Sequence, residues 1–333
     1  PGSDGQELHK DSFTRRRHRT RRALAFYYPQ DTTEEMGPTS IVPGSHYYNT
    51  LAGAMERSKE KLLTVKAGTV AIANYDIWHR GTANTSDSHR YMMKFLFARM
   101  SEPSSPTWDT VGSTWPSGDV NNRAMYRGMW DWHQNTPPKD AHNESASNLA
   151  STVLGASEPE AIDAAYKLGS SKSPSITELV ELLTDTTGSD WWEQKVLTTK
   201  GRGLTSPSAN ASYGLTAAGI SAVSALIGLA EDDRWWLRAT AAEILGDIGP
   251  TASESIPALN KLARDESSTV RAESVHALGT VGQKGSRGVT SLINSLTDDE
   301  DAVRREASMS LARTGQNAEQ ATPNLISALE DPD

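Results

Sequence analysis

His9 and Asp11 are the first residues of this 333-residue chain whose types and spacing suggest chemistry. One residue separates them, and alternate side chains of an extended strand point to the same face, so both can reach one point. An imidazole nitrogen and a carboxylate oxygen are both metal ligands. Because the chain contains no cysteine, a metal site must use histidine and carboxylate side chains. Two such residues alone are a weak signal, and a third ligand is needed.

That third ligand is His79, which ends the strand-like run "GTVAIANYDIWH" seventy residues after His9. Two histidines and one carboxylate occupy one face of an octahedral ion and leave three positions open, which suits iron(II) with a bidentate 2-oxo acid and O2. Arg90 follows eleven residues later, and its planar fork of donors matches the far carboxylate of such an acid. We predict that His9, Asp11 and His79 form a catalytic metal site beside Arg90.

The first hundred residues must supply strands that position these side chains. Aromatic and β-branched residues gather in runs that are separated by Gly, Pro, Asp and Asn, as is typical of short strands. Several short strands at such spacing predict a sandwich or barrel. The runs cover residues 23–28, 39–46, 62–75 and 90–100.

Residues 101–143 combine Pro, Ser, Gly and Asn with large aromatic side chains. A flexible linker would not need so many rings, so we expect this segment to pack on the β-domain, with Trp130 and Trp132 buried. An alternative is that it covers an active site. The aromatic residues are Trp108, Trp115, Tyr126, Trp130 and Trp132.

Residues 144–333 read as helices, and a 33-residue period is clear from about residue 213. "WLRATAAEILGDIG", "TVRAESVHALGTVG" and "AVRREASMSLARTG" align at this offset, and Arg238, Arg271 and Arg304 coincide. Each unit contains two amphipathic helices, which predicts a stacked α-solenoid. The units resemble short HEAT repeats of the kind related to phycocyanobilin lyases. We expect the matching arginines to form a structural ladder.

The amino-terminal part resembles the phytanoyl-CoA dioxygenase family of iron(II)- and 2-oxoglutarate-dependent oxygenases over about residues 7–100. The motifs are "LHKD", "GPTSIVPGSH", "GTVAIANYDIWHRGTANTS" and "HR" at 89–90. The resemblance implies a double-stranded β-helix, jelly-roll or cupin-like, which is incomplete at its amino-terminal end because the early strands of the family do not precede the HxD motif. It also implies Fe(II) as the metal, with 2-oxoglutarate and O2 as cosubstrates. The implied site comprises the ligands His9, Asp11 and His79, the 2-oxoglutarate carboxylate partner Arg90, and the pocket neighbours Asn84 and Tyr27.

Charge divides the chain unevenly, since residues 1–100 carry +5 and the rest −14 of the net −9. An acidic majority argues against a protein that coats nucleic acid. The run "RRRHRTRR" at 15–22 therefore reads as a loop at the mouth of the metal pocket, where it could attract an anionic substrate, and we expect His18 and His89 to be exposed. No apolar run approaches the roughly 18 residues of a membrane span. A cytoplasmic protein without a membrane partner is expected.

Together these patterns predict an oxygenase that hydroxylates an unactivated C–H bond of a small molecule and carries a HEAT-like interaction module. Two alternatives stay open. The β-domain could be idle, with the repeats serving as a scaffold for a protein partner, or the repeats could recruit a macromolecule for hydroxylation.

Overall fold

The computed structural model describes residues 2–11, 18–106, 123–136, 144–171, 173–185, 207–283 and 285–332. These residues group into two compact units. The first consists mainly of Pro1–Arg99, and the second of Met100–Ala156, Glu160–Gly188 and Pro207–Asp333.

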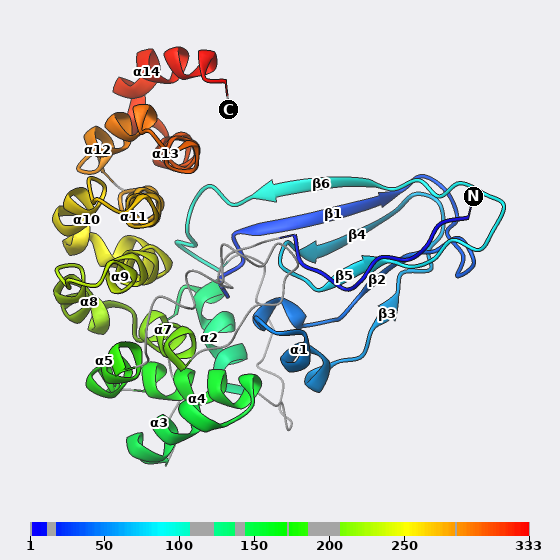
Figure 1. Ribbon diagram of the computed structural model, residues 1–333, viewed down its shortest axis with the longest axis horizontal. Coiled ribbons are helices and arrows are strands. Elements are labelled where there is room, and N and C mark those ends of the chain that lie inside the picture. Colours follow the sequence, from blue (N-terminus) through cyan, green and yellow to red (C-terminus); the bar gives the residue numbers. More distant parts are fainter. Residues whose placement is uncertain are drawn as a thin grey trace. The chain divides into compact units, whose positions relative to one another are not determined.

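The first unit contains two three-stranded antiparallel sheets, with strand orders β4-β1-β6 and β3-β2-β5 (Figure 1). Its elements are β1 (Arg22–Tyr28), β2 (Thr39–Ile41), η1 (Ser45–Tyr47), α1 (Leu51–Arg57), β3 (Lys61–Leu62), β4 (Thr69–Asn74), β5 (His79–Gly81) and β6 (Met93–Ala98).

Alternation along β1 sets which face of the larger sheet is the inner one. Leu24, Phe26 and Tyr28 are almost completely buried and form a core cluster, as expected for one face of a strand with period two. Phe26 lies opposite Ala71 of β4 and Lys94 of β6. Lys94 therefore emerges on the inner face, beside Phe26.

The predicted strand 39–46 is shorter in the structure, because β2 ends at Ile41. Gly44 has a φ of 74°, in the left-handed region that glycine adopts without strain. The chain turns there and continues into the short 3-10 helix η1. The "PGSH" stretch is thus a turn with a helical end and not the continuation of a strand.

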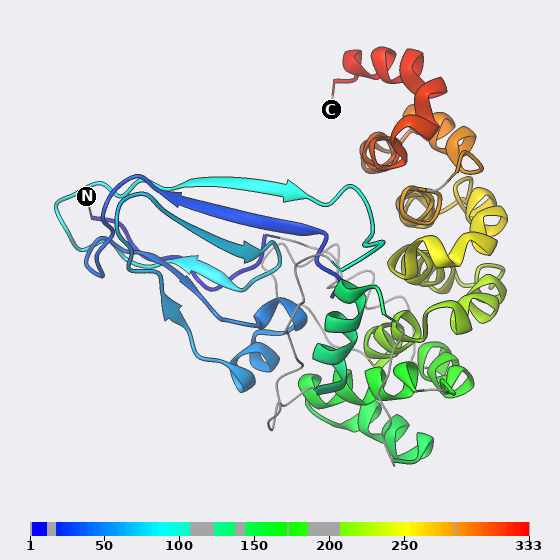
Figure 2. The ribbon, with the colours of Figure 1, turned by 180° about the vertical axis from the view of Figure 1, so that it is seen from behind.

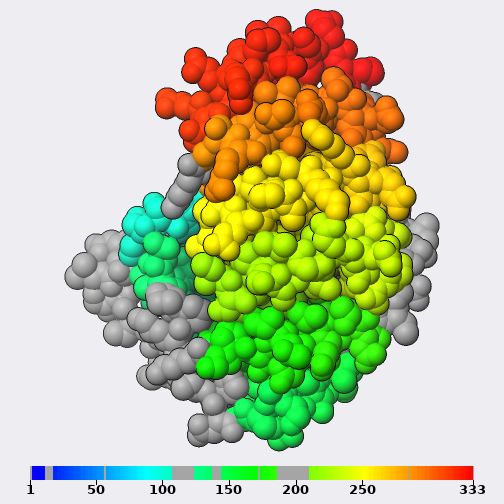
Figure 3. All heavy atoms as spheres, turned by 90° about the vertical axis from the view of Figure 1, so that its left-hand side faces the viewer, coloured from blue at the N-terminus to red at the C-terminus, as the bar shows by residue number. Residues whose placement is uncertain are grey.

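The second unit is helical, and its later part repeats with the predicted period. The helices α9, α11 and α13 begin at residues 235, 268 and 301, each 33 residues after the one before. They pack side by side in one row, while α10, α12 and α14 form the other row (Figures 1 and 2). Figure 3 shows this unit as successive bands along the chain. The helices are α2 (Arg123–Gln134), α3 (Ala146–Gly155), α4 (Glu158–Ser170), α5 (Ile176–Asp185), α7 (Pro207–Ala218), α8 (Val223–Leu229), α9 (Trp235–Ile248), α10 (Ile256–Leu262), α11 (Ser268–Val281), α12 (Val289–Asn294), α13 (Asp301–Thr314) and α14 (Thr322–Ser327).

The matching arginines form the expected ladder between repeats. Nε and Nη2 of each arginine donate to the two carboxylate oxygens of an aspartate in the next repeat, over 2.6–3.2 Å. Nη1 donates to a carbonyl in the loop before its own helix, at 3.0 Å in each case. Each guanidinium therefore joins two repeats and closes a loop, which explains the period physically. The pairs are Arg238–Asp265, Arg271–Asp298 and Arg304–Asp331.

Two helices of the repeats, α11 and α13, approach each other closely at a glycine, which has no side chain. A Cβ added to Gly279 would lie 2.4 Å from Oγ of Ser310 and 2.7 Å from its Cα. Ser310 donates from Oγ to the carbonyl of Val275, at 2.9 Å. Glycine on α11 thus lets α13 pack tightly against it.

Packing of the aromatic-rich segment 101–143 on the β-domain stays a prediction. The described parts of this segment, residues 101–106 and α2, group with the helical unit and not with the sheets. Trp130 and Trp132, on α2, are half-buried and not fully buried. Trp108 and Trp115 lie outside the described residues.

Among the described residues, one stretch, Asn210–Leu229, has the length and mean hydropathy (1.5) of a membrane-crossing helix. Half of it is buried inside the protein. Gly219, with a φ of 59°, begins the 3-10 segment η2 (Gly219–Ala222) between α7 and α8. The stretch therefore belongs to the repeat stack as two short helices.

Candidate metal centre

His9 and His79 face each other across an antiparallel pair of extended segments. Each donates its backbone N–H to the carbonyl of the other, at 3.0 Å in both directions. Farther along, the backbone N–H of Gln6 donates to the carbonyl of Gly81 at 2.8 Å. The chain before Asp11 thus runs as an additional extended segment beside β5, which brings two distant histidines to one place.

Both imidazoles are held by the same kind of bond. Nδ1 of His9 lies 2.9 Å from the carbonyl oxygen of Glu7, and Nδ1 of His79 lies 3.0 Å from that of Ile77. A carbonyl oxygen can only accept, so each Nδ1 carries a hydrogen, and the neutral form of such a ring has its lone pair on Nε2. This is the tautomer that a metal ligand needs, since a ligating histidine donates its other N–H to an acceptor.

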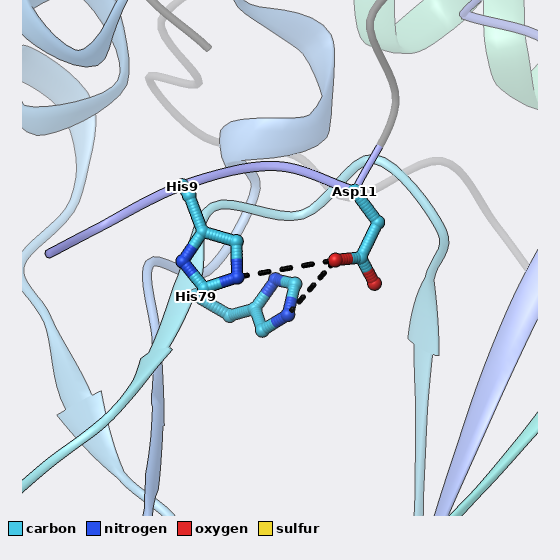
Figure 4. Close-up of side chains that lie close together, drawn as sticks. All are labelled: His9, Asp11 and His79. Carbon is cyan, nitrogen blue, oxygen red and sulfur yellow. Dashed lines mark ion pairs between the residues drawn. The ribbon is translucent and has the colours of Figure 1, made fainter. Parts of the chain in front are cut away.

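The three candidate ligand atoms converge. Oδ1 of Asp11 lies 3.9 Å from Nε2 of His9 and 3.7 Å from Nε2 of His79 (Figure 4). All ligand atoms of the group lie within 4.8 Å of one another. Cis ligands about 2.0–2.2 Å from one octahedral ion are about 3 Å apart, so the three side chains would move slightly closer together to hold an ion. The donor set therefore fits a single metal ion.

His79 is the innermost of the three candidate ligands, with 4% of its surface exposed, whereas His9 and Asp11 are partly exposed. Burial lowers the pKa of His79, and the bond to Ile77 and the charge of Asp11 oppose this effect without cancelling it. The phenyl ring of Phe26 covers the imidazole, at 6.2 Å between centroids. His79 is thus kept neutral, as metal binding requires.

Asp11 has separate partners for its two oxygens. Oδ1 faces the histidines, and Oδ2 accepts a hydrogen bond from Nζ of Lys94 at 2.8 Å. The hydroxyl of Tyr75 donates to the backbone carbonyl of Asp11 at 3.4 Å. Lys94 therefore holds the carboxylate of Asp11, and Tyr75, directly after β4, holds its backbone.

The "PGSH" stretch supports both segments that carry ligands. Ser45 is fully buried, and its Oγ accepts from the backbone N–H of Trp78, next to His79, at 2.8 Å. Its carbonyl accepts from Nζ of Lys10, between His9 and Asp11, at 3.1 Å. Lys10 also donates to the carbonyl of Tyr48, at 2.7 Å. Ser45 is thus bonded to a neighbour of every candidate ligand.

His46 of the same stretch packs against a neighbouring ring. Its ring stacks against that of Tyr47, with 3.8 Å between centroids. Burial, aided by the charge of Lys10, lowers the pKa of His46 to about 3. The imidazole is therefore neutral and adds no charge beside the site.

Arg90 lies close to the strand that carries His79. A Cβ on Gly81 would be 3.6 Å from Nη2 of Arg90. Gly81 and His79 are two residues apart on β5, so the guanidinium lies over the same face of that strand as the imidazole. The buried Tyr28 is also near, because the charge of Arg90 partly opposes the rise in the pKa of Tyr28 that burial causes.

Tyr27 and Tyr28 lie on opposite faces of β1, and a place for Tyr27 beside the pocket stays a prediction. Phe26 faces His79, and Tyr27 follows it on the opposite face of β1, where it is only half-buried. Tyr28 is the tyrosine on the inner face. The alternation of large Leu24, Phe26 and Tyr28 with Ala23 and Ala25 was the signal that could have shown this.

Asn84 stabilises the turn that leads to Arg90. Its Nδ2 donates to the carbonyl of Ser88 at 2.9 Å, and its Oδ1 accepts from the backbone N–H of Ser86 at 3.0 Å. Its backbone pairs with that of Ser3. The structure thus shows a turn residue, and a place for Asn84 beside the pocket stays a prediction.

The arginine run is described only in part, since residues 15–17 lie outside the described residues. His18 is buried and not exposed as expected, because its Nε2 lies 2.9 Å from the carbonyl of Tyr47. The guanidinium of Arg22 lies over the ring of Tyr75, at 5.8 Å. Attraction of an anionic substrate by this run stays a prediction.

Comparison with protein families assigns both parts of the chain. Residues 1–92 match the family model of phytanoyl-CoA dioxygenase (PhyH), and residues 223–312 match that of HEAT repeats. The chain joins a PhyH-family segment to HEAT repeats. The PhyH segment contains the complete His–Asp–His cluster and Arg90. A comparison with curated proteins finds no match.

Several solved structures are similar to part of the chain. The complex of CpcE and CpcF of phycocyanin lyase from Nostoc sp. PCC7120 is 19% identical with a TM-score of 0.36, and the match covers 60% of this chain and 76% of that chain. A designed armadillo repeat protein in complex with a (KR)4 peptide is 17% identical with a TM-score of 0.35, over 57% of this chain and 94% of that chain. An engineered protein is 20% identical with a TM-score of 0.34, over 56% and 82%.

Three residues around the His–Asp–His cluster could not be assigned a role from the sequence. Lys10 lies inside the HxD motif, Ser45 inside "PGSH", and Lys94 within the last strand. For Lys10 and Ser45 a motif marked the place but not the role. Lys94 had one signal, a charged residue within the apolar run "YMMKFLF", which is uncommon on an inward face unless the charge is paired.

Proposed function

We propose that the PhyH segment is an Fe(II)- and 2-oxoglutarate-dependent oxygenase that hydroxylates a C–H bond of a small molecule. The observation that carries this proposal is the convergence of two imidazole nitrogens and one carboxylate oxygen within 4.8 Å. Such a set matches the facial triad of non-haem iron(II) oxygenases. The proposal is also supported by the family match of residues 1–92.

The side chains have distinct roles in this proposal. His9, Asp11 and His79 would hold the iron from one side, and the neutral state of His79 spares the cost of deprotonation on binding. Arg90 would bind the far carboxylate of 2-oxoglutarate through its planar fork. The bound metal and cosubstrate would supply the oxidative chemistry, with O2 as oxidant and succinate and CO2 as products of the 2-oxo acid.

We propose a double-stranded β-helix as the fold around this site. Two features support it. The two antiparallel sheets face each other, since Phe26 of β1 lies 6.2 Å from His79 of β5 between ring centroids. The candidate ligand side chains lie in the space between the two sheets, as in small barrels that enclose a site.

The experiment is the release of succinate from 2-oxoglutarate by the whole chain. Turnover should require added Fe(II), should disappear in His79→Ala and should persist in His89→Ala, a matched change at an exposed histidine. Turnover without Fe(II), or failure of the chain to bind 2-oxoglutarate, would support the alternative that the β-domain is idle.

A second function is favoured by the HEAT repeats, which are stacks that present extended surfaces to proteins. We propose that they bind a protein partner, either as a scaffold or to bring a macromolecular substrate to the oxygenase. Affinity capture with the whole chain should return a partner that Gly279→Val, which disturbs the stack, does not retain. If the wild type and Gly279→Val capture the partner equally, the partner does not bind to the repeat stack.

A further inference from the structure

Lys94 lies on the inner face of β6, opposite Phe26 of β1. Its ammonium is 5.7 Å from the centre of the Phe26 ring and 2.8 Å from Oδ2 of Asp11. Both side chains of this ion pair are about one-third exposed or less (37% for Lys94, 25% for Asp11). The aliphatic stem of Lys94 thus packs on an aromatic ring while its charge reaches one oxygen of a candidate metal ligand.

The two oxygens of Asp11 face different partners. Oδ1 lies 3.7–3.9 Å from both histidine Nε2 atoms, whereas Oδ2 is the acceptor for Lys94. A carboxylate can bind a metal through one oxygen or through both. We propose that Lys94 is a positioning residue that holds Oδ2 and so restricts Asp11 to binding the metal through Oδ1 alone.

This inference rests on the proposed metal site and adds to it. In an octahedral ion, three protein ligands leave three positions for a bidentate 2-oxo acid and O2. A second oxygen from Asp11 would occupy one of these positions. Lys94 therefore leaves all three remaining coordination positions available, although it does not itself touch the metal.

The charge of Lys94 has an opposing effect that must be separated from this role. A cation near a divalent metal repels it, so removal of the charge alone would tighten metal binding. Hydrogen-bond partners of metal ligands act in the other direction, and their loss typically weakens metal binding by about 10- to 100-fold. The two explanations thus predict opposite changes in affinity.

The test uses Mn(II) as a probe with the whole chain, because its bound waters can be counted by water-proton relaxation. Lys94→Met keeps the aliphatic stem and removes the donor, and Lys94→Arg restores a donor. Lys66→Met is the matched control, since Lys66 donates to Asp31 over the same 2.8 Å in an exposed pair away from the cluster. Circular dichroism and melting of each variant check that it is folded.

For the wild type we expect Mn(II) binding with relaxation equivalent to about three exchangeable waters. Lys94→Met should lose about a third of the relaxation per bound Mn(II) if Oδ2 turns to the metal, or bind Mn(II) about 10-fold more weakly if the carboxylate turns away. Lys94→Arg should recover most of either loss, and Lys66→Met should match the wild type.

Unchanged relaxation together with unchanged or tighter Mn(II) binding in Lys94→Met would overturn the proposal. Failure of Lys94→Arg to recover the loss would do so as well. If the wild type itself binds no Mn(II), the proposed metal site is wrong. This result is distinct from a failure of the Lys94 proposal, which compares variants of a protein that does bind Mn(II).

Discussion

Ser45→Ala should loosen the metal site without adding or removing any ligand. The hydroxyl of Ser45 is fully buried and accepts from the backbone N–H of Trp78 at 2.8 Å. Alanine leaves that N–H buried without its acceptor, which costs about 1–3 kcal/mol. Since Trp78 precedes His79, this cost falls on the strand that carries the innermost ligand.

Amide hydrogen exchange over residues 76–80, followed by mass spectrometry, measures this effect locally. A loss of 1–3 kcal/mol corresponds to exchange about 5- to 150-fold faster at the Trp78 amide. Affinity for Mn(II) should fall by about 10-fold, as is typical when the support of a ligand is removed.

Ser88→Ala is the control, because Ser88 is exposed in the loop before Arg90. Its exchange over residues 76–80 and its Mn(II) affinity should equal those of the wild type. If Ser45→Ala also leaves both quantities unchanged, the view that "PGSH" supports the ligand strands is wrong.

Three further predictions concern the repeats. Arg271→Met should destabilise the helical unit by about 1–3 kcal/mol in urea unfolding, because Asp298 and a loop carbonyl lose their donor. Gly279→Val should lower the melting temperature more, since its Cβ would meet Ser310 at 2.4 Å and the helices must separate. Burial raises the pKa of Asp298, but the bonds from Arg271 outweigh it and the net direction is downward. A carboxyl with a lowered folded pKa stabilises the fold above its unfolded value of about 3.9, so stability should fall as the pH drops below about 4, and less steeply in Arg271→Met.

Two controls make these predictions specific. Arg305→Met removes an exposed pair with Asp301 and should change stability by less than about 0.5 kcal/mol. A Cβ on Gly285 meets nothing within 4 Å, so Gly285→Ala should leave the melting temperature nearly unchanged. Equal losses in the control and the test variant of either pair would contradict the packing described for the ladder or for the helix contact.

The sequence was most informative where chemistry or periodicity restricts the residue type. The 33-residue period marked α9, α11 and α13, because each repeat must reproduce the same contacts. The three candidate ligands could be selected because few residue types can hold a metal in a chain without cysteine. Their convergence, with both Nε2 atoms directed to Oδ1 of Asp11, then appeared in the structure.

The features of the site that the sequence did not predict depend on which face of a strand a side chain occupies. Tyr27 and Tyr28 are adjacent, and Tyr28 faces inward with Leu24 and Phe26 in the core cluster. The role of Lys94 depends on the pairing of β1 with β6, which a local pattern does not specify. His18 lies in a charged run, yet the carbonyl of Tyr47, 29 residues away, gives it a buried partner.

Anaerobic titration with Fe(II) tests the central claim most directly. The wild type should bind one equivalent, and His79→Ala and Asp11→Ala should each weaken binding by about 100-fold or more, since a ligand is lost from a site that has only three. His89→Ala, at an exposed histidine, should bind as the wild type does. Equal Fe(II) binding by all four proteins would show that His9, Asp11 and His79 are not the iron site.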